Sequence, residues 1–157
     1  MVFVASSDVI KRLVVLIADS KPHSRFLLRS MLLQLEVRNI HEAADGSAAL
    51  DAINSINPDI LILDWNLNGL TARDVLRLMR SQSPNSDPAL RTIIVSSSGE
   101  YRSVQEAMGL GAPHFMVWPI SPKMLQQRLL GIVTEARKTA RNYMRRVSAS
   151  EASSAPP

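Results

Sequence analysis

Three uninterrupted runs of aliphatic residues constrain the fold of this chain more than any other feature of its sequence. The runs cover residues 13–18, 60–63 and 93–95, and none of them alternates polar with apolar residues. Continuous apolar runs are typical of strands that are buried on both faces, as in a parallel sheet covered by helices. Two shorter segments, 40–43 and 115–117, are further strand candidates.

Segments with helical periodicity separate the strand candidates. Apolar residues recur three and four positions apart after Pro22, Gly46, Thr71, Gly99 and Pro122, and proline is a favoured residue in the first turn of a helix. The chain therefore alternates strand and helix five times. This order predicts an α/β domain built on a doubly wound, five-stranded parallel sheet.

Composition excludes several kinds of site and location. The length of 157 residues fits one domain, and the absence of cysteine excludes disulfide bonds and thiolate metal ligands. No apolar run approaches the roughly 20 residues that a membrane span needs. The apolar residues 1–5 are too few for the core of a signal peptide. We therefore expect a cytoplasmic protein with no membrane partner.

Polar or aromatic residues follow four of the five strand candidates directly. They are Asp19, Asp64, Ser96 and Trp118, and ligands of open α/β sheets bind at the carboxyl ends of the strands. A single aspartate at such a place often caps a turn. Two carboxylates at one edge are costly unless a cation or a proton neutralises them, and paired carboxylates suit Mg²⁺. We therefore expect Asp19 and Asp64 to hold Mg²⁺.

The residues at these strand ends, with the stretches around them, resemble the receiver domains of two-component response regulators. The stretches are 17–19, 42–46, 64–67, 95–97 and 110–119, and the match extends over about residues 11–135. Each stretch alone is weakly specific, but their joint order and spacing are specific. The chain is similar to the single-domain chemotaxis regulators in particular. The resemblance implies a flavodoxin-like (βα)5 fold.

The resemblance also implies roles for individual residues. Asp64 matches the phosphoacceptor, whose carboxylate becomes an acyl phosphate. Asp19 matches the acidic ligand of Mg²⁺, and Asn66 supplies a main-chain carbonyl to the same ion. Ser96 matches the switch hydroxyl that binds a phosphoryl oxygen, and Phe115 occupies the aromatic switch position.

Three positions depart from the family pattern. Ala18 replaces a second acidic residue, Asn68 replaces a proline, and Trp118 replaces a lysine whose ammonium pairs with the phosphoryl group. The Trp118–Pro119 bond matches a position that is usually cis in the family. An indole carries no charge and cannot neutralise a phosphoryl group as an ammonium does. We therefore expect an atypical receiver with weakened Mg²⁺ binding.

Two interpretations of this atypical site remain open. In the first, the chain is a stand-alone response regulator that accepts phosphate on Asp64 from a sensor histidine kinase or a phosphotransfer protein. In the second, it is a pseudo-receiver that acts as a protein-interaction or dimerisation module. Neither is an enzyme, beyond self-phosphorylation and self-dephosphorylation. A haloacid-dehalogenase-type phosphatase would need a second aspartate at the position of Asn66.

The end of the chain carries the whole net charge of +4. Residues 1–127 hold equal numbers of acidic and basic residues, whereas residues 128–157 hold six basic and two acidic ones. The helical pattern runs on from Pro122 to Val147, about 39 Å at 1.5 Å per residue. This extension is a solvated, frayed end, a homodimer or partner interface, or a nucleic-acid contact. We expect no nucleic-acid partner, because no helix-turn-helix accompanies it.

These patterns divide the chain into four parts. We expect a flexible leader over residues 1–10 and the receiver domain over residues 11–135. A basic extension of the last helix follows over residues 136–147. The Ser/Ala/Pro-rich residues 148–157 are expected to be a disordered tail.

Overall fold

A computed structural model describes residues 6–82 and 91–153 of the chain. Its five strands are β1 (Val14–Ala18), β2 (Asn39–Ala43), β3 (Ile60–Asp64), β4 (Arg91–Ser96) and β5 (His114–Val117). They form one sheet in the order β2-β1-β3-β4-β5, and every neighbouring pair is parallel. The predicted doubly wound five-stranded sheet is therefore confirmed.

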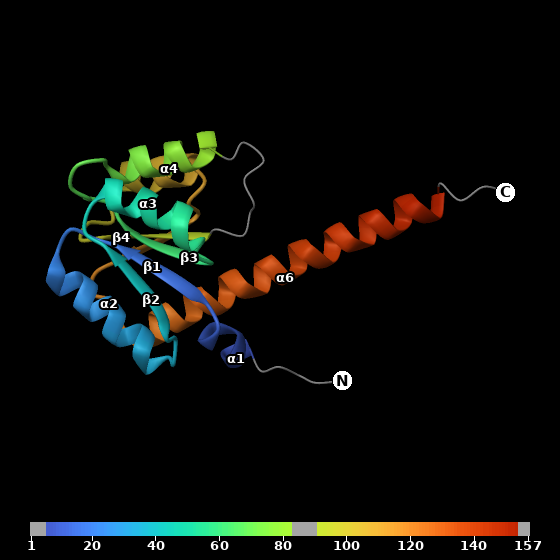
Figure 1. Cartoon of the computed structure of the whole chain (residues 1–157), viewed down its shortest axis with the longest axis horizontal. Coiled ribbons are helices and arrows are strands. Elements are labelled where there is room, and N and C mark those ends of the chain that lie inside the picture. The colour runs from blue at the N-terminus through green and yellow to red at the C-terminus, as the bar shows by residue number, and fades with distance from the viewer. Residues whose placement is uncertain (1–5, 83–90, 154–157) are drawn as a thin grey trace.

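Helices cover both faces of this sheet. They are α1 (Ser6–Lys11), α2 (Pro22–Gln34), α3 (Gly46–Ile56), α4 (Ala72–Gln82), α5 (Tyr101–Gly109) and α6 (Pro122–Ser153). Figure 1 shows α3 and α4 on one side of the strands and α1 and α2 on the other. Alternate residues of the strands point to opposite faces of the sheet and belong to two separate apolar clusters. One cluster lies under α1, α2 and α6, and the other lies under α3, α4 and α5.

The register of the strands decides where the site can form. All five residues of β3 are buried, which explains why its sequence is continuously apolar rather than alternating. Asp64 at the end of β3 pairs with Val95, directly before Ser96. On the other side, Ala18 pairs with Leu63, so Asp19 follows beside Asp64. The three polar residues therefore share the carboxyl edge of the sheet.

Within the predicted flexible leader, the residues that the structure describes form a helix. Residues 6–11 form helix α1, and Ile10 is 2% exposed within the cluster under α2 and α6. The Lys11 ammonium lies 2.7 Å from the carboxylate of Glu36, which follows α2 by two residues. Two neighbouring apolar residues, Val9 and Ile10, give this short helix a face to bury. Residues 1–5 lie outside the described residues.

Helix α6 continues to Ser153, so residues 148–153 of the predicted disordered tail are helical in the structure. Once a helix is formed, each added residue contributes a hydrogen bond without a new nucleation cost. Ala149, Glu151 and Ala152 are good helix formers, and they offset the intervening serines. Residues 154–157 lie outside the described residues.

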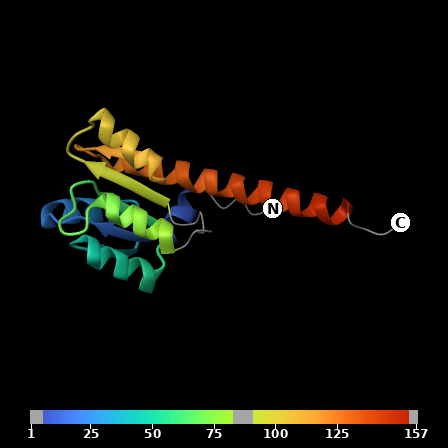
Figure 2. The same cartoon turned by 90° about the horizontal axis from the view of Figure 1, so that it is seen from above.

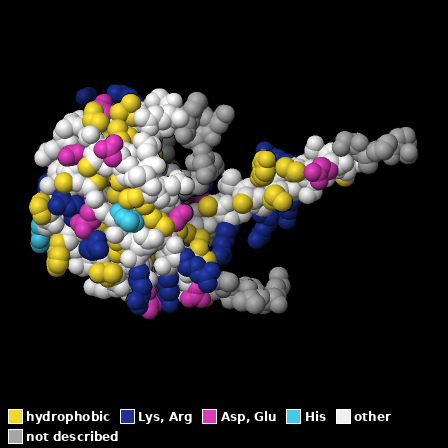
Figure 3. Space-filling view, in the orientation of Figure 1, with side chains coloured by type: hydrophobic (Ala, Val, Ile, Leu, Met, Phe, Trp, Pro, Cys, Tyr) yellow, Lys and Arg dark blue, Asp and Glu magenta, His cyan; other side chains and the backbone are white. Residues whose placement is uncertain are grey.

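Helix α6 extends far beyond the sheet, as the sequence predicted. Its buried residues are Leu125, Leu129, Ile132 and Val133, all in its first twelve positions. Figure 2 shows the remainder running past the end of the domain, and Figure 3 shows apolar and basic side chains on different sides of it. No described helix is long and apolar enough to span a membrane.

Candidate functional site

Two buried aspartates form the centre of the candidate site. Asp19 follows β1 and is 2% exposed, and Asp64 ends β3 and is 5% exposed. Asp19 Oδ1 accepts a hydrogen bond from the backbone N–H of Lys21 at 2.8 Å. Asp64 Oδ1 accepts one from the backbone N–H of Asn66 at 3.3 Å. Each carboxylate is thus oriented by the turn that follows its own strand.

The second carboxylate oxygen of Asp64 has an unusual environment. Asp64 Oδ2 is buried and has no hydrogen-bond partner among the described residues. Buried polar atoms in folded proteins are almost always satisfied, and an exception commonly marks a missing ion or water. A divalent cation between Asp64 and Asp19 would satisfy this oxygen, so the donor set fits Mg²⁺.

This site has fewer acidic ligands than a dedicated metal centre. Within residues 6–82 and 91–153, no group of three or more His, Cys, Asp or Glu side chains gathers to hold a metal. Ala18, at the position where a second acid would stand, is fully buried in the cluster under α3, α4 and α5. The set is therefore two carboxylates completed by neutral oxygens, which favours a weakly held ion.

The electrostatics of Asp19 show the cost of this arrangement. Burial raises the pKa of Asp19 above its ordinary value, and the neighbouring Asp64 carboxylate raises it further. The backbone N–H and the ammonium charge of Lys21 act in the opposite direction. The Asp64 carboxylate therefore disfavours the ionised form of Asp19, and a bound cation would relieve this repulsion.

The loop that follows Asp64 is held by two neighbouring segments. The backbone N–H of Asn68 donates to Ser20 Oγ at 2.8 Å, and the Asn68 carbonyl accepts from the Gly46 N–H at 3.4 Å. A Cβ added at Gly46 would lie 2.2 Å from the Leu70 carbonyl oxygen, so only glycine allows α3 to start this close. These contacts fix the acceptor loop against β1 and α3.

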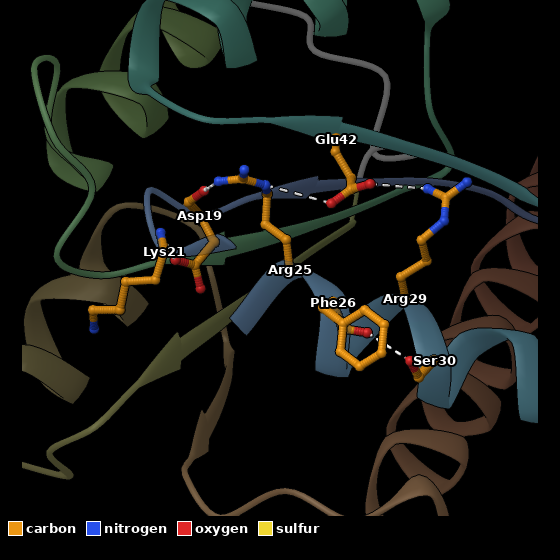
Figure 4. A network of polar contacts seen from close by, with 7 residues as sticks. All are labelled: Asp19, Lys21, Arg25, Phe26, Arg29, Ser30 and Glu42. Atoms are coloured by element: carbon orange, nitrogen blue, oxygen red, sulfur yellow. Dashed lines mark hydrogen bonds and ion pairs between the residues drawn. The ribbon is translucent and has the colours of Figure 1, made fainter. Parts of the chain in front are cut away.

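A polar network joins the end of β1 to α2 and β2 (Figure 4). Arg25 Nη1 donates to the main-chain carbonyl of Asp19 at 2.7 Å, and Arg25 Nε lies 3.4 Å from Glu42. Arg29 binds the other oxygen of Glu42 at 3.1 Å. Arg25 therefore holds the backbone that carries the predicted metal ligand.

Ser96 and Trp118 lie on the opposite side of Asp64 from Asp19. Ser96 is 1% exposed, its Oγ accepts from the Ser98 N–H at 3.1 Å, and its carbonyl accepts from the Trp118 N–H at 2.9 Å. The Trp118–Pro119 bond is cis, as predicted. The Trp118 side chain is half-buried and packs against the cluster under α2 and α6. Part of the indole thus belongs to the apolar core.

The aromatic residue at the predicted switch position contacts a second aromatic ring. Phe115 is partly buried on the α3–α4–α5 side of the sheet, and its ring centroid lies 6.4 Å from that of Trp65. The Arg73 guanidinium lies 4.7 Å from the Trp65 ring centroid and donates through Nε to Glu106 of α5. This hydrogen bond lowers the pKa of Glu106 and raises that of Arg73.

Sequence reasoning placed the strand-end residues correctly but missed their support. Asp19, Asp64, Asn66 and Ser96 gather at one edge, whereas the roles of Ser20, Arg25 and Arg73 were not anticipated. Ser20 could have been suspected because it directly follows Asp19. No local signal pairs Arg25 with Glu42 or Arg73 with Glu106, because these partners come from different elements.

Comparisons with known proteins agree with this geometry. Residues 15–130 match the model of the response regulator receiver domain. A chemotaxis protein, CheY of Pseudomonas aeruginosa, is 30% identical over 115 residues, which are 73% of this chain and 91% of that protein. A protein-glutamate methylesterase/protein-glutamine glutaminase of Myxococcus xanthus is 31% identical over 135 residues, but the chain covers only 38% of it.

Solved structures show the same fold. The crystal structure of the CheX–CheY–BeF3–Mg²⁺ complex from Borrelia burgdorferi matches with a TM-score of 0.68 and 25% sequence identity. The match covers 76% of this chain and 87% of that chain. With the family match over residues 15–130 and the strand-end aspartates in one place, the chain belongs to the family of response regulator receiver domains.

Proposed function

We propose that this protein is a response regulator whose receiver domain accepts a phosphoryl group on Asp64 with the help of Mg²⁺. The observation that carries the proposal is the buried Oδ2 of Asp64, which lacks a hydrogen-bond partner among the described residues and belongs to a side chain that neighbours Asp19. An oxygen without a donor is available both to a cation and to an electrophilic phosphorus. The similarity to the Pseudomonas chemotaxis protein, 91% of which is covered, supports a receiver of the chemotaxis-regulator kind.

In the proposed reaction, one Asp64 oxygen attacks the phosphorus of a phosphohistidine on a kinase or phosphotransfer partner. A P–O bond forms, the P–N bond breaks, and the histidine nitrogen leaves with the bonding electron pair. Asp19, Asp64 and the main-chain carbonyl of Asn66 would hold Mg²⁺, which neutralises charge on the phosphoryl oxygens. The Ser96 hydroxyl would move toward the phosphoryl group and donate a hydrogen bond to one of its oxygens. The Phe115 ring, at the aromatic switch position, would turn inward with this movement.

The second interpretation, a pseudo-receiver, has its own support. Trp118 stands where the family has lysine, and its ring packs partly into the core. Ala18 removes a second acidic ligand. Without the ammonium, the phosphoryl group would lose a charge-assisted hydrogen bond of about 1.5–3 kcal/mol. That loss corresponds to roughly 10- to 100-fold weaker binding, so slow phosphorylation is consistent with the first interpretation and normal efficiency is not.

Titration with Mg²⁺ and beryllofluoride, an analogue of the phosphoryl group, tests the proposal. We expect the wild-type protein to bind the analogue in the millimolar range and Asp64→Asn to lose binding. Trp118→Lys should tighten binding by about tenfold or more, because it restores the charge-assisted contact. Asp45→Asn is the matched control, since Asp45 only caps α3. Absence of binding by the wild type would support the pseudo-receiver instead.

The C-terminal extension is the proposed site of homodimer formation. Tyr143 and Met144 are 65% and 61% exposed on α6, beyond its last buried residue. Burying such side chains against a second copy would support a helix that the domain does not cover. Light scattering on the full chain and on a chain ending at residue 136 tests this idea. A finding that both chains are monomeric would contradict it.

We also propose that the protein acts in the cytoplasm. Its proposed partners are a sensor histidine kinase or a phosphotransfer protein.

A further inference from the structure

A continuous line of contacts runs from the acceptor carboxylate to helix α5. Trp65 follows Asp64 directly, is 6% exposed, and its backbone N–H donates to the Val95 carbonyl at 2.9 Å. The Arg73 guanidinium lies 4.7 Å from the centroid of the Trp65 ring. A cation at this distance from an indole is attracted to it. The backbone that carries Asp64 is therefore tied to the first turn of α4.

The same guanidinium reaches a second element. Arg73 Nε donates to Oε1 of Glu106 on α5, and both side chains are only partly exposed. Arg73 itself is well fixed, because α4 starts with Asp74 accepting hydrogen bonds from the backbone N–H and the hydroxyl of Thr71. Its neighbours Ala72 and Val75 are fully buried. Arg73 thus joins the acceptor loop to α5 from a rigid base.

Helix α5 buries little of its own surface against the core. Ala107 is the one buried residue among the nine residues of α5, and Tyr101 and Met108 are 74% and 56% exposed. An element with few buried apolar contacts opens and shifts more easily than the core. The ion pair between Arg73 and Glu106 can therefore shift the position of this helix, together with the weaker hydrogen bond that Arg80 Nη1 donates to the Gly109 carbonyl at 3.4 Å.

We propose that Arg73 is a positioning residue that couples the state of Asp64 to the position of α5 through the Trp65 ring and the Glu106 carboxylate. This inference rests on the proposed function, because it needs a ligand at Asp64. A ligand bound at Asp64 shifts Trp65, the next residue in the chain. This shift changes the position of the Arg73 guanidinium over the indole ring and therefore its hydrogen bond to Glu106. By thermodynamic reciprocity, a partner that binds α5 changes the affinity of the acceptor site.

Amide hydrogen exchange of residues 101–109, with and without Mg²⁺ and beryllofluoride, measures this coupling. In the wild type we expect the analogue to change exchange in α5 by about fivefold or more. Arg73→Met should abolish most of this response while the analogue still binds. Glu106→Gln should do the same, and the double variant should lose no more than either single one. Arg12→Met, at an exposed arginine that directly follows α1 and lies outside α4 and α5, is the matched control.

The outcomes separate the inference from the function beneath it. A full α5 response in both Arg73→Met and Glu106→Gln overturns the coupling and leaves phosphorylation of Asp64 intact. An equal loss in Arg12→Met also overturns it, because the effect would then be one of general charge. If the wild type binds no analogue at millimolar concentration, the proposed function and the coupling fall together. Glu106 is partly exposed, so we expect Glu106→Gln to fold. This variant therefore tests the coupling even if Arg73→Met folds poorly.

Discussion

Replacing Asp64 with asparagine should stabilise the protein when no divalent cation is present. In the wild type, Asp64 Oδ2 is buried without a hydrogen-bond partner among the described residues, and the Asp64 carboxylate lies close enough to Asp19 to raise its pKa. The Asp64→Asn substitution would remove one of two like charges. The amide nitrogen that it introduces would also offer a donor to the Asp19 carboxylate. The substitution thus converts a repulsive pair into a hydrogen-bonded one.

The expected gain follows from the buried oxygen. A buried polar group without a partner costs about 1–3 kcal/mol, so the free energy of unfolding should rise by about this amount. Each kcal/mol shifts the melting temperature of a domain of this size by about 2–4 °C. Mg²⁺ should shrink the difference, because an ion at about ten times its dissociation constant stabilises the wild type by about 1.4 kcal/mol.

Urea or thermal unfolding in EDTA and in Mg²⁺ measures both effects. Asp45→Asn is the control, because Asp45 is exposed and caps α3 through the Ala48 N–H at 2.8 Å, a role that asparagine fills equally well. Its stability should change by less than about 0.5 kcal/mol. If Asp64→Asn is no more stable than the wild type in EDTA, the view of a strained acidic pair is refuted.

Two further predictions concern stability. Gly46→Ala should lower the free energy of unfolding in urea by about 1–3 kcal/mol, because the new Cβ would lie 2.2 Å from the Leu70 carbonyl oxygen. Gly131→Ala in α6 is the control: nothing lies within 4 Å of its added Cβ, so it should stabilise the protein by up to about 1 kcal/mol. Equal effects of the two substitutions would contradict the close approach at Gly46. Burial lowers the pKa of His114, and Glu135 offsets this only in part. The unfolded chain therefore binds more protons below pH of about 6.5, so the free energy of unfolding should fall as the pH drops through that value. His114→Gln should show a smaller fall in parallel titrations, and an unchanged slope would contradict the assignment.

Local sequence patterns were sufficient for the sheet and for the central residues of the site. Continuous apolar runs such as 60–63 encode burial on both faces, and strand–helix alternation forces neighbouring strands to be parallel. Parallel strands end at the same edge, so the sequence alone places Asp19, Asp64 and Ser96 together. The helix at residues 6–11 was missed because one turn with two apolar residues is too short to show a period.

The amino-acid sequence by itself thus determined the architecture, the acidic edge and the family, because these depend on periodicity and on the order of elements along the chain. Only the tertiary structure decided which side chains support the acids. The partners Ser20 and Asn68 are 48 residues apart, and Arg73 and Glu106 are 33 apart. At such separations many pairings are compatible with the same pattern of polar and apolar residues. Packing selects one of them, since the geometry of a hydrogen bond or an ion pair exists only once the elements are in place.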